Sequence, residues 1–112
     1  MFLGAPRTRV TDINDCAAML DTFQRHGHNE VDCARSYGGG TSEQVLAQLQ
    51  WRQRGMVVGT KVNPMQHAHK KDTLRAGLSA SLQALGSDKV DLWYLHMPDA
   101  STILSDPYIA HW

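Results

Sequence analysis

The chain has 112 residues, which is enough for one small domain with a single core. Hydrophobic residues make up 42% and charged residues 20%, values typical of a globular protein rather than a disordered or fibrous one. Basic and acidic residues number 11 each, so nothing in the charge balance favours nucleic acid or an anionic membrane surface. No apolar run approaches the roughly 20 residues of a membrane span. Cys16 and Cys33 do not form a disulfide pattern, so we expect a reducing, cytoplasmic location.

The first part of the chain predicts a strand, a helix and a second strand. Residues 1–4 are compatible with a short strand, and Thr11 or Asp12 can cap a helix that Gly27 ends. The apolar residues of this helix recur at helical spacing: Ile13, Cys16, Ala17, Leu20 and Phe23. Residues 30–34 then predict a strand.

The middle of the chain predicts a second helix and a third strand. Glycines at 38–40 break regular structure, and Thr41–Gln44 match a capping box, in which Thr and Gln side chains satisfy backbone groups. The helix that follows ends near Gly55, and its apolar stripe is Val45, Leu46 and Leu49. Residues 56–61 predict the next strand.

The last part of the chain predicts a polar loop, a third helix and a fourth strand. Asp72 caps the helix and Gly86 closes it. Its leucines form a stripe at positions 74, 78, 82 and 85. Residues 90–95 predict a buried strand, apolar on both faces apart from Asp91 and with Trp93 in the core. Apolar strands that alternate with one-stripe helices predict an α/β fold with a parallel sheet covered by helices.

Four ionisable residues stand at the ends of these strands. Asp32, Lys61 and His96 close successive strands, and Tyr37 lies five residues beyond the first of them. Because parallel strands end on one side of a sheet, we expect the four side chains to meet there. A free phenol has a pKa of about 10 and donates its proton poorly near neutrality. A neighbouring ammonium lowers that pKa by stabilising the phenolate. Such a set suits protonation of a carbonyl that is being reduced by hydride.

Three segments at these strand ends resemble the aldo-keto reductases. Val31–Gly38 is similar to the family's Asp-Thr-Ala-x-x-Tyr-Gly segment, although Cys33 stands where threonine is usual. Gly59–Val62 resembles the family's lysine strand, and Asp91–His96 its histidine strand. His96–Asp99, with Gly27–Asp32 upstream, is most similar to the aflatoxin-aldehyde reductase branch. The resemblance covers roughly residues 10 to 102.

The resemblance implies a role for each residue of this set. Tyr37 would donate the proton, Lys61 would make that phenol a stronger acid, and His96 would orient the carbonyl of an aldehyde or ketone substrate. Asp32 would pair with Lys61 and lie beside the nicotinamide ribose of NADPH, which would supply the hydride. The implied fold is the N-terminal half, about four βα units, of an eight-stranded (β/α)8 TIM barrel.

Family barrels run to about 250 residues or more, and their later strands carry the phosphate and adenine loops. We therefore expect residues 1–102 to be a partial, truncated reductase domain with weak or no turnover, and 103–112 to be a tail outside the family pattern. The alternative is a non-enzymatic remnant that keeps the four residues without binding cofactor, and open strand edges would favour its self-association. A flavodoxin-like domain is less favoured, because residues 5–8 do not resemble a phosphate loop.

The remaining motifs are interpreted as structural. His67 and His69 are expected to be solvated loop residues rather than ligands of a metal, because no third ligand lies nearby in the sequence. Met97 and Asp99, just past the last strand, are candidates for the substrate mouth. Cys33 is expected to be buried and unreactive.

Overall fold

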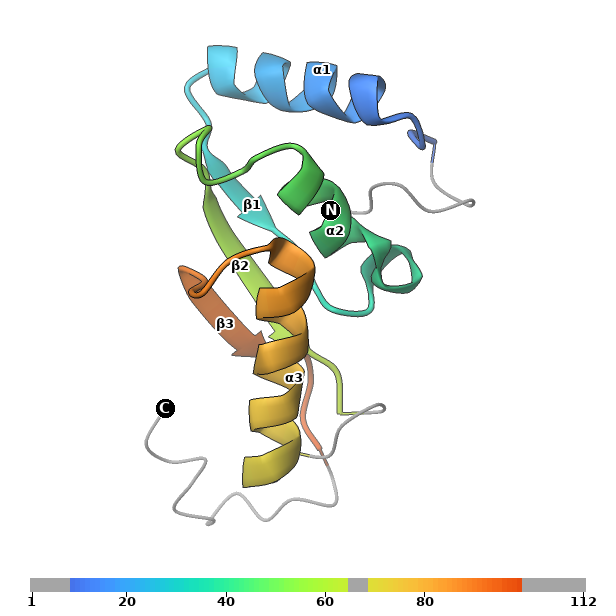
Figure 1. Cartoon of the computed structure of the whole chain (residues 1–112), viewed down its shortest axis with the longest axis vertical. Coiled ribbons are helices and arrows are strands. Elements are labelled where there is room, and N and C mark those ends of the chain that lie inside the picture. The colour runs from blue at the N-terminus through green and yellow to red at the C-terminus, as the bar shows by residue number, and fades with distance from the viewer. Residues whose placement is uncertain (1–8, 65–68, 100–112) are drawn as a thin grey trace.

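The computed structural model describes residues 9–64 and 69–99 (Figure 1). Its elements, in chain order, are α1 (Ile13–Arg25), β1 (Glu30–Asp32), the 3₁₀ turn η1 (Tyr37–Gly40), α2 (Thr41–Gln48), β2 (Val57–Val62), α3 (Lys71–Leu85) and β3 (Leu92–Leu95). The predicted strand at residues 1–4 and the predicted tail at 103–112 lie outside the described residues. None of the described helices has the length and apolar character needed to cross a membrane.

The three described strands form one parallel sheet in the order β1-β2-β3, as predicted. Asp32 pairs with Gly59 and Lys61 pairs with Tyr94, so the strands advance together toward the same side of the sheet. β2 lies in the centre, and its residues 58–60 are buried. In Figure 1, α2 and α3 lie beside each other over one face of the sheet, and α1 crosses the top of the view. This layout sends all three strand ends to one rim.

Helix α1 begins as its sequence predicts. The Asp12 carboxylate caps it by accepting hydrogen bonds from the backbone N–H groups of Asn14 at 2.8 Å and Asp15 at 3.4 Å. Cys16 and Leu20 are fully buried and join the core shared by α1, α2 and the strands. The predicted apolar stripe therefore faces the core.

Helix α2 begins and ends differently from the prediction. Its N-cap is Gly40, and Thr41 is already the first helical residue, so the predicted capping box is wrong. The Thr41 hydroxyl instead donates to the Gly38 carbonyl oxygen at 2.9 Å. The helix ends at Gln48 rather than near Gly55, because turns occupy the residues between them. Glycines with a left-handed backbone conformation set this early start, since they turn the chain directly into the helix.

Helix α3 is shifted and rotated relative to the prediction. It begins at Lys71 with Lys70 as N-cap, so Asp72 lies inside the first turn. Gly86, with φ of +60°, closes it as predicted. The buried residues of the helix are Leu74, Gly77, Ser81 and Leu85, whereas Leu78 and Leu82 of the predicted stripe are half-buried. The buried face of α3 thus includes two small residues, and two of the predicted leucines lie at its margin.

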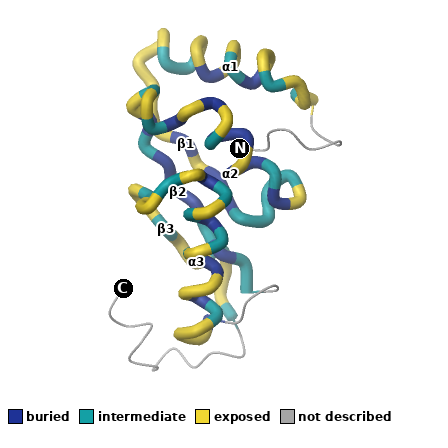
Figure 2. The backbone as a smooth tube through the Cα atoms, viewed as in Figure 1, coloured by how far each residue is buried: buried dark blue, intermediate teal, exposed yellow. Residues whose placement is uncertain are grey.

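Strand β3 is present, but the prediction that it is buried is wrong. Leu92, Tyr94 and Leu95 are 39%, 47% and 38% exposed, and Trp93 is half-buried (Figure 2). Within residues 9–64 and 69–99 it pairs with β2 alone, and its side chains, which alternate between the two faces of the sheet, are exposed on both of them. An apolar strand that would be central in a closed sheet therefore has its outer side uncovered.

Candidate active site

The four predicted site residues all lie at the rim where the strands end. Asp32 is the last residue of β1, Lys61 is the penultimate residue of β2, and His96 directly follows β3. Tyr37 opens η1, which β1 leads into. The ladder of backbone hydrogen bonds continues past the strands, because His96 N–H donates to the Val62 carbonyl oxygen at 2.9 Å. The backbone positions of the site are thus part of the sheet itself.

The side chains of the four residues form one continuous cluster. Lys61 Nζ lies 2.5 Å from Asp32 Oδ1 and donates to the Cys33 carbonyl oxygen at 2.7 Å. The same ammonium is 5.3 Å from the centroid of the Tyr37 ring. The Tyr37 and His96 rings meet edge to face, with centroids 5.6 Å apart and planes at 80°. The predicted gathering of a carboxylate, an amine, a phenol and an imidazole is confirmed.

The ammonium of the cluster is largely withdrawn from water, whereas its carboxylate partner is not. The Lys61 side chain is 13% exposed and that of Asp32 is 66% exposed. Two oxygen acceptors and the face of an aromatic ring surround the charge, and each of these stabilises a cation. The ammonium is therefore held beside the Tyr37 ring, and the open carboxylate can still accept a hydrogen bond from a ligand.

The imidazole of His96 has unused hydrogen-bonding capacity. Its Nδ1 is buried and has no hydrogen-bond partner in the part of the chain that the structure describes. Buried polar atoms are satisfied in most proteins, so an orphaned one points to a group that completes the site. His96 thus has the property expected of a residue that binds a ligand.

Cys33, between Asp32 and the Tyr37 segment, is fully buried, as predicted. Burial raises the pKa of its thiol to about 11, and the nearby Glu43 carboxylate acts in the same direction. A thiol with this pKa stays protonated at physiological pH and is a poor nucleophile. The substitution of the usual threonine therefore adds no second reactive group to the site.

The prediction that His69 is solvated is wrong. It is buried, its backbone N–H donates to Asp99 Oδ2 at 2.9 Å, and its ring Nε2 lies 2.9 Å from the Met97 carbonyl oxygen. It thereby joins the loop after β2, where His69 lies, to the loop after β3, where Met97 and Asp99 lie. His67 lies outside the described residues, and among those described no three metal-ligating side chains gather.

Sequence reasoning missed a buried carboxylate behind the site. Glu43 is fully buried, pairs with Arg35, and accepts a hydrogen bond from the Thr60 hydroxyl at 2.7 Å. The available signal was its spacing, since Glu43 stands three residues before Leu46 and so shares the core face of α2. The predicted capping box at Thr41–Gln44 instead places Glu43 on the polar start of the helix.

Comparisons with known proteins point to one family. The profile of the Aldo/keto reductase family matches residues 2–109. An aldo-keto reductase of Pseudocercospora fijiensis is 56% identical over 89 residues, which are 75% of this chain and 30% of that protein. The aflatoxin B1 aldehyde reductase member 4 of Homo sapiens is 38% identical over 98 residues, covering 83% of this chain and 30% of that protein. The crystal structure of an aldo-keto reductase from Klebsiella pneumoniae in complex with NADPH superposes with a TM-score of 0.70 at 25% identity, over 88% of this chain and 34% of that chain.

The chain therefore spans about a third of the length of the relatives it matches. Its parallel sheet and helices correspond to part of a TIM-barrel protein, which confirms the predicted fold class. The predicted similarity to aflatoxin-aldehyde reductases is also confirmed, because such enzymes are among the relatives. On the match of its family profile across nearly the whole sequence, the chain belongs to the aldo/keto reductase family.

Proposed function

We propose that this chain carries the proton-donating part of an oxidoreductase that reduces aldehydes or ketones to alcohols with NADPH. The observation that carries the proposal is the contact of Lys61 with both the Asp32 carboxylate and the face of the Tyr37 ring. An ammonium held in that position stabilises a phenolate, and this makes the phenol a better proton donor.

Each of the four residues has one task in this proposal. Tyr37 Oη gives its proton to the oxygen of the carbonyl as that oxygen gains negative charge. Lys61 holds the resulting phenolate, and Asp32 keeps Lys61 in place through their 2.5 Å contact. His96, beside the Tyr37 ring, orients the carbonyl by hydrogen bonding to its oxygen.

The residues present fit the reacting end of NADPH. The half-exposed Asp32 carboxylate can accept hydrogen bonds from ribose hydroxyls beside the nicotinamide. The buried His96 Nδ1, which has no hydrogen-bond partner among the described residues, supports the proposal that a further group completes the site. When bound, the cofactor supplies the hydride.

A non-enzymatic remnant that self-associates is the second candidate, and one specific observation favours it. The exposed apolar side chains of β3 lie on a strand whose outer edge has no partner among the described residues. Such edges readily pair with another chain.

Residues 103–112 remain a predicted non-family tail. The free thiols of Cys16 and Cys33 support a reducing, cytoplasmic location.

The test of the reductase proposal is carbonyl-dependent oxidation of NADPH by the chain, with cofactor binding followed by fluorescence. Tyr37→Phe removes the proton donor and keeps the ring, so we expect the rate to fall at least about 100-fold. The matched control is Tyr94→Phe, which makes the same change on exposed β3 and should leave the rate unaltered. Absence of both NADPH binding and oxidation in the unmodified chain would leave only the remnant.

A further inference from the structure

A buried carboxylate joins the segment that carries Tyr37 to the strand that carries Lys61. One oxygen of Glu43 accepts a hydrogen bond from the Arg35 guanidinium, and the other accepts from the Thr60 hydroxyl at 2.7 Å. Arg35 stands two residues before Tyr37, and Thr60 directly precedes Lys61. Because Glu43 is fully buried, these hydrogen bonds form away from water, where they are strongest.

Arg35 also fixes both ends of the segment in which Tyr37 lies. Its backbone N–H donates to the Lys61 carbonyl oxygen at 3.0 Å, which anchors the start of the segment to β2. Its side-chain Nη2 donates to the Gly40 carbonyl oxygen at 2.8 Å, which anchors the end. The phenol therefore stands between two fixed points, and one residue provides both of them.

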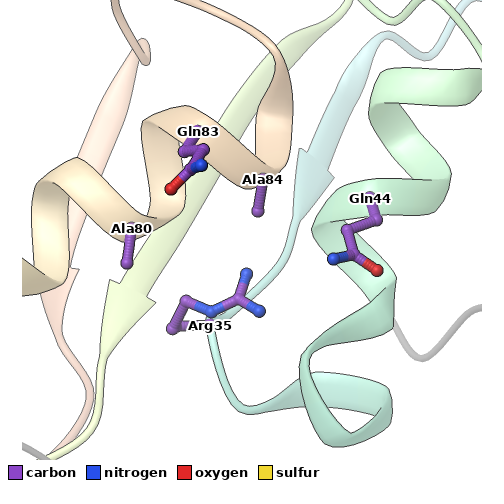
Figure 3. A pocket seen from close by; sticks show the side chains of 5 residues that line it. All are labelled: Arg35, Gln44, Ala80, Gln83 and Ala84. Atoms are coloured by element: carbon purple, nitrogen blue, oxygen red, sulfur yellow. The ribbon is translucent and has the colours of Figure 1, made fainter.

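The outer side of this arginine is not packed into the core. Arg35 lines an open cavity of about 490 Å³ between α2 and α3, together with Gln44, Ala80, Gln83 and Ala84 (Figure 3). In the close-up, its guanidinium lies between the two helices. The Arg35 side chain is 19% exposed, so a shorter apolar side chain removes these hydrogen bonds together with part of its packing.

We propose that Arg35, Glu43 and Thr60 are positioning residues that set the place of Tyr37 relative to Lys61 and His96. The inference rests on the proposed function, because it assigns to these three residues the positioning of the proton donor, Tyr37. Tyr37 and Lys61 belong to different elements, so their separation depends on contacts that cross between those elements. A misplacement of about 1 Å at such a site can cost about 100-fold in rate.

The test measures nuclear Overhauser effects between the ring protons of Tyr37 and His96. It uses the chain itself and does not depend on turnover. Thr60→Val removes one hydroxyl at nearly constant shape. Arg35→Met combined with Glu43→Gln removes both charges together, so that no carboxylate stays buried without its partner. We expect the ring contacts to weaken or vanish in both variants while the far-ultraviolet circular dichroism is retained. Where the unmodified chain oxidises NADPH, kcat should fall about 10- to 100-fold with little change in KM for the carbonyl.

The matched control removes a second arginine–carboxylate pair that is remote from Tyr37. Arg54 Nη1 lies 2.5 Å from Asp21 Oδ1, and Arg54→Met with Asp21→Asn should leave the ring contacts intact. Unchanged ring contacts in the Thr60 and Arg35–Glu43 variants, or equal loss in the control, would overturn the inference. So would loss of the fold in both variants, which would assign the network to stability alone. Failure of the proposed function would be recognised separately. In that case the unmodified chain would keep its ring contacts and show no turnover.

Discussion

At the scale of single residues, Gly40 has two reasons to be glycine where Gly39 has one. Both have left-handed backbones, with φ of +100° and +67°. A Cβ on Gly40 would lie 2.6 Å from Arg35 Nη2, whereas a Cβ on Gly39 would meet nothing within 4 Å. The Arg35 side chain is held by Glu43 and by the Gly40 carbonyl oxygen, so it cannot move aside without breaking those bonds.

The two glycines therefore predict different costs for the same substitution. Gly39→Ala should lower the free energy of unfolding by about 1 kcal/mol, the cost of a left-handed alanine. Gly40→Ala should lower it by about 3 kcal/mol, because a charged hydrogen bond is lost as well. Urea denaturation of the two variants measures the difference. Equal losses would show that Arg35 does not restrain this turn.

The residues in and behind the site show what the sequence can and cannot predict about it. Asp32, Lys61 and His96 were predictable, because the end of an apolar run marks the end of a strand and parallel strands end on one rim. The pairing of Glu43 with Arg35 was not predictable, because it depends on which face of α2 the sheet covers. A glutamate in a first helical turn is also favourable when exposed, so the spacing of Glu43 from Leu46 does not by itself establish its burial.

At the scale of elements, β2 and β3 are joined by a side chain as well as by their backbones. Asp91, directly before β3, accepts a hydrogen bond from the backbone N–H of buried Val58 at 2.9 Å. Without that carboxylate, a buried donor near the start of the central strand would lose its acceptor. Asp91, the one charged residue in an apolar run, therefore has a structural role at the start of the strand that leads to His96.

Asp91→Ala should lower the free energy of unfolding by about 1–3 kcal/mol, the cost of an unsatisfied buried donor. Amide hydrogen exchange at Val58 should become faster, because its protection depends on this one acceptor. Asp88→Ala, an exposed aspartate three residues earlier, serves as the control and should change neither quantity. Unaltered exchange at Val58 in the Asp91 variant would contradict this assignment.

Element boundaries and rotations were predicted less well than the elements themselves, for reasons of tertiary contact. The 3.6-residue period located α3, but its buried face includes Gly77 and Ser81, which a stripe of large apolar residues does not mark. Composition identified β3 as a strand, yet its burial depends on what lies on its outer side, which a local pattern does not encode.

At the scale of the whole molecule, the sheet has a covered side and an apolar edge that is open. Leu92, Tyr94 and Leu95 project from β3, and each is more than a third exposed. Soluble proteins usually protect an edge strand with charges or a covering element, and these residues supply no charge. The edge is thus the part of the described structure best suited to pair with a second copy.

We expect the chain to associate through this edge, which sedimentation velocity over a range of protein concentrations measures. Tyr94→Lys places a charge in the middle of β3, so it should shift the chain toward monomer by penalising burial of that strand. Met19→Lys makes the same kind of change at an exposed apolar residue of α1 and should leave association unaltered. If both variants sediment like the unmodified chain, the contact lies elsewhere. If only Tyr94→Lys dissociates it, the strand that places His96 at the site is also the strand through which copies meet.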